Sequence, residues 1–363
     1  MAEVQHNSAL RSRIRFLHHT LSMVQQVNCA LPPGVGLDSY TIVRQLSLGG
    51  FSIVYLAVDA VGTAVVIKEY LPNSLALRSE GKRCPNVAPE HLAAFRYGMK
   101  CFFEEGRALA RLSHPNVIRV LNFFRANDTV YMVMEYEEGR TLQEYIQKHK
   151  AVISENFIRS VFTRALNGLR EVHSHKLLHL DLKPSNIYLR SDGTPVLLDF
   201  GAARQTLASD TPMLKPMYTP GFASPEHHKR EHLGPWSDIY SIGATMYSCL
   251  AGAAPQAADA RIERDLLVPA AERWADTYSP HLLETIDWCL AINHLDRPQS
   301  VFALQKALTS NKIRGRNRKS PGSWLSQIVG IFRKEMGFRK AAFAADPRKP
   351  QMVSGFKKEM GDK

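Results

Sequence analysis

Short runs of alternating apolar and polar residues begin near Tyr40, and glycines separate them, as in an antiparallel meander. This pattern predicts strands at 40–43, 53–58 and 64–67. A helix-like spacing of apolar residues follows over 89–113. Two more strand-like runs lie at 117–124 and 129–136. The first part of the chain is therefore expected to be a sheet with one long helix.

After Gly139 the pattern becomes mostly helical, up to about residue 310. Strands first and helices afterwards favour an α+β protein with two unequal lobes. We expect a small antiparallel, β-rich N-lobe over 38–136 and a larger, mainly helical C-lobe over 137–310. The remaining segments are an N-terminal extension, residues 1–37, and a C-terminal tail, residues 311–363.

The composition is that of an ordinary globular protein, with 45% hydrophobic and 22% charged residues among 363. The five cysteines are scattered and form no Cys-x-x-Cys pair, so neither a zinc ribbon nor a disulfide framework is expected. No run of 18 apolar residues and no basic-then-apolar leader pattern is found. A cytoplasmic protein is the expectation.

The net charge of +12 is concentrated in the tail. Residues 312–363 hold 14 Lys and Arg against 4 Asp and Glu, a net +10, so no nucleic-acid-binding main domain is expected. Apolar residues from Trp324 to Met336 recur at helical spacing. Three interpretations stay open: a solvated charged segment, a peripheral anchor at the inner membrane face, or a docking segment for an acidic partner protein. Beyond Asp346 we expect disorder.

A glycine-containing hairpin is expected between the first two long strands. Gly49 and Gly50 lie between apolar runs, with Ser47 and Ser52 beside them. Small residues let backbone N–H groups approach phosphate oxygens, so this hairpin is a candidate phosphate cover. An ordinary glycine hairpin is the competing interpretation.

Lys68 ends the apolar run 64–67, and a buried ammonium group is costly without a partner. It is either an edge residue that points to water or a ligand for nucleotide phosphates. In the second case a helix glutamate should orient it, and Glu105 is the candidate. Glu104 is adjacent, but only one of these glutamates can face the lysine, because neighbouring helix residues lie about 100° apart.

The strongest signal is a polar segment between two apolar stretches. The run His-Leu-Asp-Leu-Lys-Pro-Ser-Asn at 179–186 brings together Asp181, Lys183 and Asn186. Asp199 follows a further apolar run and begins the triplet Asp-Phe-Gly. An aspartate at the end of a buried strand is a natural metal ligand. The order and spacing indicate phosphoryl transfer, which needs a phosphate cradle, a cation, metal ligands and a hydroxyl-proton acceptor.

This set of motifs resembles the eukaryotic-type protein Ser/Thr kinase family, and most of all its bacterial branch. The resemblance covers about residues 38–310 and implies transfer of the ATP γ-phosphate to protein Ser/Thr hydroxyls in bacterial intracellular signalling. It implies that Asp181 accepts or orients the proton of the substrate hydroxyl and that Lys183 steadies the γ-phosphate. Asn186 and Asp199 would bind Mg²⁺, and Mn²⁺ suits the same oxygen ligands.

The resemblance also implies an ATP site. Lys68 would hold the phosphates and pair with Glu105, and Met134 resembles the gatekeeper beside adenine. The hinge whose backbone meets adenine would run from Glu135 to Glu137. The phosphate hairpin and the strand after it would contribute Ser47, Gly49, Gly50, Ser52 and Val54.

Later landmarks match the same family. Glu226, in Ser-Pro-Glu, resembles the end of the activation segment, and Arg297 resembles its arginine partner. Asp238 resembles the aspartate that anchors the catalytic loop. Thr219, in Thr-Pro-Gly, resembles the substrate-hydroxyl pocket of Ser/Thr kinases.

Three departures from the family pattern have consequences. Ser47 and Ser52 replace the first and third glycine of the phosphate loop, and serine is less permissive for positive φ. The long stretch between Lys68 and Glu105 is expected to be an insertion, either regulatory or a solvated loop. Leu180 replaces an arginine that binds an activation-loop phosphate in relatives, so we expect activity without such phosphorylation.

Two other functions compete with a protein kinase. A pseudokinase, a scaffold with a kinase fold, is expected to lack Lys68, Asp181 or Asp199, and all three are present. A kinase of small molecules is expected to lack the Ser-Pro-Glu triplet, Asp238 and Arg297. The first observation favours an active enzyme, and the presence of the triplet, Asp238 and Arg297 favours a protein substrate.

Overall fold

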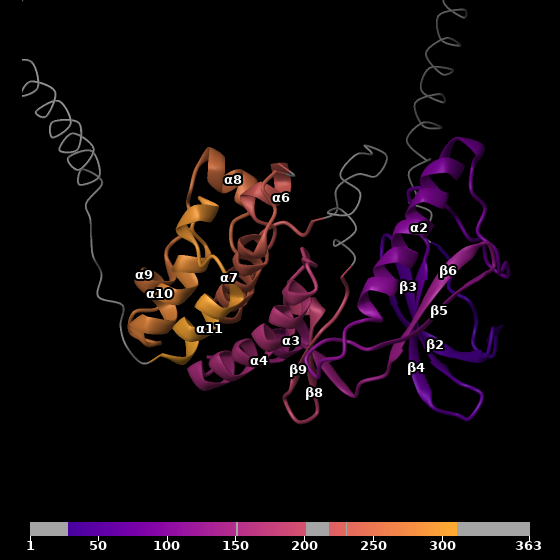
Figure 1. Ribbon diagram of the computed structural model, residues 1–363, viewed down its shortest axis with the longest axis horizontal. Helices are drawn as coiled ribbons and strands as arrows, with labels where there is room; N and C mark the ends of the chain where they lie inside the picture. Colours follow the sequence, from indigo (N-terminus) through magenta and orange to yellow (C-terminus); the bar gives the residue numbers. More distant parts are fainter. Residues whose placement is uncertain (1–27, 150–151, 201–217, 230, 311–363) are drawn as a thin grey trace, which may run out of the picture. The chain divides into compact units, whose positions relative to one another are not determined.

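One antiparallel sheet organises the first part of the chain (Figure 1). The computed structural model describes residues 28–149, 152–200, 218–229 and 231–310. The six strands lie in the order β1-β2-β3-β4-β6-β5. Their bounds are β1 Gly36–Leu37, β2 Tyr40–Leu48, β3 Ser52–Val58, β4 Ala64–Tyr70, β5 Val120–Ala126 and β6 Thr129–Glu135.

Strand register divides the central strands into two faces. Lys68 pairs with Val54 on β3 and with Met132 on β6, so these three side chains share one face. The next residue, Glu69, points to the opposite face, where Tyr131 is its partner on β6. Glu69 and Tyr131 are both fully buried, so this second face is covered as well.

The long helix α2, Leu92–Leu109, packs against β5 and β6 after a short 3₁₀ turn, η1, Pro89–His91 (Figure 1). A glycine permits its close approach to β4. A Cβ atom at Gly98 would lie 1.8 Å from the Tyr70 hydroxyl, so no larger residue fits there. The Tyr70 ring then packs against Phe95 and Phe102 of the helix. This contact fixes the face of α2 that carries Glu105.

The segment between β4 and α2 is folded onto the sheet rather than solvated. Leu71 and Arg78 are buried, with 0% and 1% of their surface exposed. Leu77 and Asn86 form an antiparallel bridge through paired backbone hydrogen bonds. The alternative of a solvated loop is therefore wrong for the residues next to β4, whereas the tip around Lys82 is exposed.

The second part of the chain is mainly helical, with a small sheet at its start. Strands β7, β8 and β9 pair antiparallel in that order. The bounds are β7 Gly139–Thr141, α3 Leu142–Lys148, α4 Glu155–Ser174, η2 Pro184–Asn186, β8 Ile187–Arg190, β9 Pro195–Leu197, α6 Pro225–Lys229, α7 Pro235–Ala251, α8 Ala258–Glu263, α9 Ala270–Arg273, α10 Pro280–Cys289, η3 His294–Asp296 and α11 Val301–Thr309.

Local sequence explains where these helices begin. Thr141 and Glu144 form a reciprocal capping box at the start of α3, and Ser154 caps α4.

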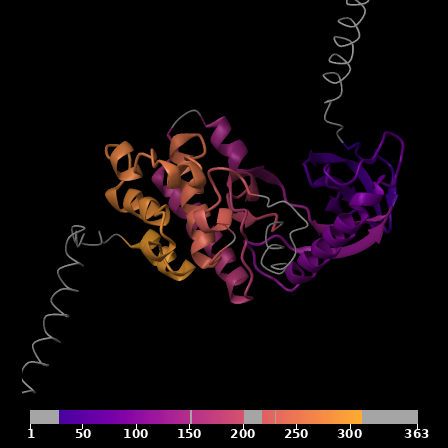
Figure 2. The ribbon, with the colours of Figure 1, turned by 90° about the horizontal axis from the view of Figure 1, so that it is seen from above.

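Helix α7 is buried over most of its length, and α10 packs against it. The helices from α7 to α11, coloured orange to yellow, gather in one region in both ribbon views (Figures 1 and 2).

The predicted α+β arrangement with strands first and helices afterwards is confirmed. No helix in the described ranges is long and apolar enough to cross a bilayer. The predictions for the basic tail 311–363 and for most of the N-terminal extension fall outside the described residues.

Candidate functional site

The predicted phosphate hairpin joins β2 and β3. The Gly49 N–H donates to the Ser52 carbonyl at 2.9 Å and closes the turn. None of residues 47–52 adopts the left-handed backbone conformation. The lower tolerance of serine for positive φ therefore has no consequence at positions 47 and 52. Val54, on β3, shares the face of Lys68.

Lys68 is buried on β4 and forms an ion pair with Asp199, with 2.5 Å between Nζ and Oδ1. The Asp199 side chain remains 40% exposed. Glu105 lies on the buried face of α2 and is 4% exposed. The neighbouring Glu104 is 46% exposed and pairs with Arg107 of the same helix. The helix thus turns Glu105, and not Glu104, toward the sheet that carries Lys68.

The predicted hinge begins at the end of β6, where Met134 pairs with Val66 of β4. Beyond it, the Glu137 carboxylate forms a two-pronged ion pair with Arg190 of β8. The Glu137 carbonyl also accepts a hydrogen bond from the Tyr188 hydroxyl at 3.1 Å. Glu137 therefore joins the hinge to the small sheet, and the nearby charge of Glu135 also acts on Arg190.

A second polar cluster surrounds Asp181. The Lys183 ammonium group donates to Asp181 Oδ2 and to the Thr219 hydroxyl, each at 2.8 Å. The Thr219 hydroxyl in turn donates to Asp181 Oδ1 at 3.1 Å. The Asn186 amide nitrogen donates to Asp181 Oδ2 at 2.9 Å and to its carbonyl at 2.8 Å. Three neighbours thus fix the orientation of one carboxylate.

The loop that carries Asp181 is held by hydrogen bonds to Asp238, at the start of α7. Asp238 is fully buried and accepts from the backbone N–H groups of His179 and Leu180 at 2.9 and 2.7 Å. His173, near the end of α4, donates to the same carboxylate at 2.7 Å. Burial alone raises a carboxyl pKa, but these hydrogen bonds hold the pKa of Asp238 below its usual value. Asp238 is therefore ionised.

This anchor holds an unusual backbone conformation. Leu180 has a φ of 60°, which is strained for a residue with a side chain. Its side chain is 2% exposed and packs inside the protein. The anchor thus stabilises a turn that the local sequence alone disfavours.

His179 links the two polar clusters. Its Nε2 bonds to the Leu198 carbonyl at 2.9 Å, and its Nδ1 accepts from the Asp181 N–H at 3.4 Å. Because burial lowers the pKa of His179, the ring is neutral with its proton on Nε2. The Leu198 N–H also donates to the Asn186 carbonyl at 2.9 Å. Asp199, the next residue, is therefore held beside the loop of Asp181.

Asn186 and Asp199 suit a divalent metal ion by their donor chemistry. The amide nitrogen of Asn186 is used by Asp181, and its side-chain oxygen has no hydrogen-bond donor among the described residues. Asp199 offers a partly exposed carboxylate. Oxygen ligands of this kind suit Mg²⁺, which takes few protein ligands together with substrate phosphates. No group of three or more His, Cys, Asp or Glu side chains that could hold a metal ion is found in the described ranges.

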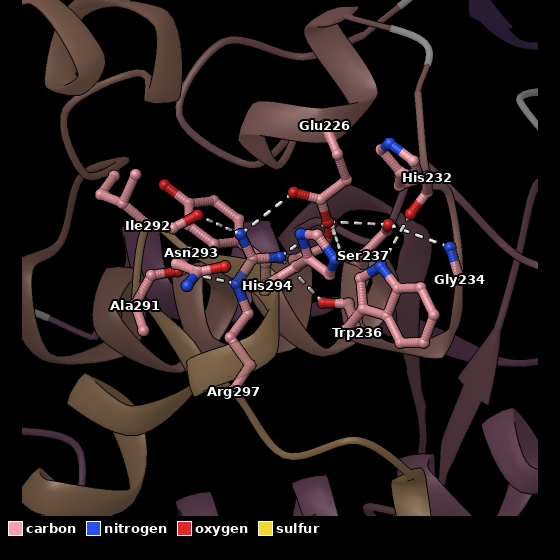
Figure 3. A network of polar contacts seen from close by, with 12 residues as sticks. Glu226, His232, Gly234, Trp236, Ser237, Ala291, Ile292, Asn293, His294 and Arg297 are labelled. Atoms are coloured by element: carbon pink, nitrogen blue, oxygen red, sulfur yellow. Dashed lines mark hydrogen bonds and ion pairs between the residues drawn. The ribbon is translucent and has the colours of Figure 1, made fainter. Parts of the chain in front are cut away.

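A buried ion pair joins α6 to the residue that follows η3 (Figure 3). Arg297 donates to both Glu226 oxygens, at 2.7 and 3.0 Å, and both residues are buried. Its remaining N–H groups reach the carbonyls of Ala291, Trp236 and Ile292. All five guanidinium donors are therefore used.

Sequence reasoning thus identified the main polar residues, and the structure joins them in two linked clusters. Lys68 meets Asp199, while Asp181 meets Lys183 and Asn186. Two contributors were missed. His173 carries no local signal, since only its position near the end of α4 brings it to Asp238. His179 was part of the polar segment but received no separate role.

Comparisons with known proteins agree with this geometry. The family model described as "Protein kinase domain" matches residues 40–309. The chain is 29% identical over 226 residues to a probable serine/threonine-protein kinase PknB of Lactococcus lactis, covering 62% of this chain and 33% of that protein. It is 31% identical over 234 residues to serine/threonine-protein kinase B of Synechocystis, covering 61% and 38% of the two chains.

Solved structures give the same result. The structure called "PpkA-294 apo form" superposes with a TM-score of 0.69 at 33% identity, covering 77% of this chain and 99% of that one. A mutant of the Mycobacterium tuberculosis PknI kinase domain gives 0.58 at 23% identity and shows likeness of fold. The chain spans about a third of the length of the curated relatives named here.

Proposed function

Because the chain belongs to the protein kinase family and resembles bacterial members of it, we propose that it transfers the γ-phosphoryl group of ATP to Ser or Thr hydroxyls of proteins in bacterial intracellular signalling. One observation carries the proposal. The Asp181 carboxylate is held by Lys183, Thr219 and Asn186, next to the ion pair of Lys68 with Asp199. Together these groups supply the parts that phosphoryl transfer needs.

Asp181 is the proposed acceptor or orienting group for the substrate hydroxyl proton. Its two oxygens are fixed by three donors, so little reorganisation is needed when a hydroxyl group arrives. Lys183 contacts Asp181 and is the proposed cation for the transferred phosphoryl group. The Thr219 hydroxyl contacts both Lys183 and Asp181. We therefore propose that the substrate hydroxyl group approaches Asp181 from the side of Thr219.

ATP is proposed to bind between the hairpin of β2 and β3 and the hinge. Lys68, oriented by Glu105, would contact the phosphates, and Ser47, Gly49, Gly50 and Ser52 would cover them. Val54 and Met134, on the face of the sheet that carries Lys68, are the proposed apolar contacts of adenine. Glu135 and Glu137 provide the hinge backbone. These assignments rest on the family pattern, and the shared face of β3, β4 and β6 supports them.

Mg²⁺ is the proposed metal ion, held by Asn186 and Asp199, and Mn²⁺ fits the same oxygens. When bound, it neutralises charge on the phosphates. Asp181 orients Asn186 through the amide nitrogen, so that the amide oxygen is left for the metal. His179 holds the backbone before Asp199 through the Leu198 carbonyl.

The basic tail is proposed to bind an anionic partner, either an acidic protein or an anionic membrane surface. Its net charge of +10 over residues 312–363 supports this. Sedimentation with anionic vesicles, with and without residues 312–363, distinguishes a membrane anchor from a solvated tail that has no partner. Added salt should weaken either interaction.

The catalytic proposal is tested by radiolabel transfer from γ-labelled ATP to a generic basic protein, followed by phosphoamino-acid analysis. We expect label on serine or threonine, and a loss of at least about a hundredfold in Asp199→Ala. Label on tyrosine alone would contradict the substrate class. Equal transfer by wild type and Asp199→Ala would point to a contaminating kinase, and no transfer at all would favour a scaffold.

A further inference from the structure

The tip of the phosphate hairpin is tied to the segment that follows β4. The Leu71 N–H donates to the Phe51 carbonyl at 2.9 Å, which extends the pairing of β3 with β4 by one step. The Asn73 N–H then donates to the Gly50 carbonyl at 2.8 Å. Two successive carbonyls of the tip are therefore held by residues outside the hairpin.

A turn presents the Asn73 N–H to the hairpin. The N–H groups of Leu75 and Ala76 both donate to the Pro72 carbonyl at 3.0 Å. This pattern puts Asn73 at the second position of a β-turn, where a φ near −60° is usual. The turn thus has a defined backbone, and its position decides where the hairpin tip can lie.

Asn28 fixes this turn from the N-terminal side. Its amide nitrogen donates to Asn73 Oδ1 at 2.7 Å and to the Ala76 carbonyl at 3.1 Å. Its oxygen accepts from the Arg78 N–H at 2.5 Å. Asn28 is 2% exposed, so these bonds are shielded from water. We call residues 28–31 and 71–78 together the brace.

The brace is anchored to the strand of Lys68. The Arg78 guanidinium forms a two-pronged ion pair with Glu69, and it also donates to the Tyr55 hydroxyl and the Cys29 carbonyl. Glu69 follows Lys68 directly and points to the opposite face of β4. One buried network therefore connects the hairpin tip to the strand that carries the phosphate lysine.

We propose that Asn28 and Asn73 are positioning residues that hold the phosphate hairpin in its nucleotide-binding conformation. The inference rests on the proposed ATP site. A two-stranded hairpin with adjacent glycines at its tip is conformationally mobile by itself, and ordering it on binding costs entropy. A brace that holds the tip in advance removes part of this cost and strengthens ATP binding. The segment between Lys68 and the helix of Glu105 thus takes part in nucleotide binding.

Three substitutions separate the parts of the brace. Asn73→Pro removes both the N–H that bonds Gly50 and the oxygen that accepts from Asn28, at a turn position where proline is favoured. Asn73→Ala keeps this N–H but loses the contact with Asn28. Asn28→Ala removes the buried amide from the other side. Ser74→Ala, an exposed neighbour in the same turn, is the matched control.

The first measurement is the affinity for Mg²⁺ and a non-hydrolysable ATP analogue, with KM for ATP and kcat. Compared with Asn73→Ala, we expect Asn73→Pro to weaken analogue binding and raise KM about fivefold further, the effect of the one N–H hydrogen bond by which these two variants differ, with kcat within about twofold. Asn28→Ala and Asn73→Ala should each weaken binding about two- to fivefold. Ser74→Ala should match wild type.

The second measurement, hydrogen–deuterium exchange without nucleotide, does not depend on the proposed activity. Residues 47–54 should exchange about fivefold faster in Asn28→Ala and Asn73→Pro than in wild type. If these variants exchange at the wild-type rate and bind the analogue with wild-type affinity, the proposal that Asn28 and Asn73 position the hairpin is wrong. If Asn73→Pro does not fold, the two alanine variants decide by the same criteria. A wild type that binds no analogue would instead overturn the proposed ATP site, and the exchange result would still decide whether the brace holds the hairpin.

Discussion

Arg78 and Glu69 are joined by two hydrogen bonds of 2.6 and 2.7 Å, and neither side chain has any exposed surface. The hydroxyls of Tyr55 and Tyr131 each donate to one Glu69 oxygen at 2.7 Å. Burial, then the charge of Glu69, raises the pKa of both tyrosines, so both remain protonated donors. Every polar atom of this pair therefore has a partner, which is the condition for a stable buried ion pair.

Replacing one member of this pair should destabilise the fold strongly. Arg78→Met leaves the Glu69 carboxylate buried without its cation, and we expect a loss of about 3–5 kcal/mol in the free energy of unfolding. Arg83→Met, at an exposed position in the same segment, should change it by less than about 0.5 kcal/mol. Urea denaturation followed by circular dichroism measures both. A loss below about 1 kcal/mol in Arg78→Met would contradict the proposed anchor.

The two adjacent glutamates of α2 should differ sharply in their effect on catalysis. Glu105 is buried toward the sheet of Lys68, whereas Glu104 is exposed and pairs with Arg107. Glu105→Gln should lower kcat/KM by about ten- to a hundredfold, because a charge-assisted contact is worth about 1.5–3 kcal/mol. Glu104→Gln should stay within about twofold. Steady-state kinetics with both variants provides the comparison, and equal effects would contradict the assignment of Glu105.

The free energy of unfolding should decrease as the pH is lowered, because buried histidines are neutral in the folded protein. Burial lowers the pKa of His227, and its Nε2 has no hydrogen-bond partner in the described part of the chain. The unfolded chain takes up the proton first, near its ordinary pKa of about 6.5. The contribution of neutral His227 to stability is therefore complete above that pH. It is lost as the pH falls toward the lowered pKa of His227 in the folded protein. The slope is at most about 1.4 kcal/mol per pH unit for one histidine.

Denaturation of wild type and His227→Gln at pH 7.5 and pH 5.5 tests this linkage. The stability difference between the two pH values should be smaller in His227→Gln. His149→Gln, an exposed histidine, serves as the control and should keep the wild-type difference. If the pH dependence of stability is unchanged in His227→Gln, the prediction that His227 contributes to it is wrong.

Activity should not depend on phosphorylation near the Asp-Phe-Gly triplet. Leu180 is buried and offers no cation for a phosphate. The candidate acceptors Thr206, Ser209 and Thr211 lie outside the described residues. Replacing all three with alanine should leave kcat within about threefold of wild type. A loss of about a hundredfold would defeat the idea.

The residues of the clusters around Asp181 and Lys68 were predictable because short motifs mark each of them, although the ion pair of Lys68 with Asp199, 131 residues away, was not predicted. Asp181 and Asn186 lie close together in the sequence. Asp199 directly follows an apolar run, and an aspartate at the end of a buried strand is a natural metal ligand. The brace was not predictable, because Asn28 and Asn73 are 45 residues apart and only the folded sheet brings them together. No local pattern marks such a contact.

Ser47 and Ser52 show what the residue pattern leaves open. The family pattern has glycine at both positions, and serine is less permissive for positive φ. The backbone of this hairpin stays outside the left-handed region, so the steric argument does not apply. Residue patterns indicate which positions matter, but the actual backbone angles decide whether a substitution is costly.

The central claim is that one nucleotide with its metal ion is bound by Lys68, Asp199 and Asn186 beside Asp181. The most direct test is a crystal structure with Mn²⁺ and a non-hydrolysable ATP analogue, in which anomalous scattering locates the metal. We predict a peak in coordination with the Asn186 side-chain oxygen and the Asp199 carboxylate, with Lys68 on the phosphates. A metal bound elsewhere, or a nucleotide that contacts none of these side chains, would contradict the account.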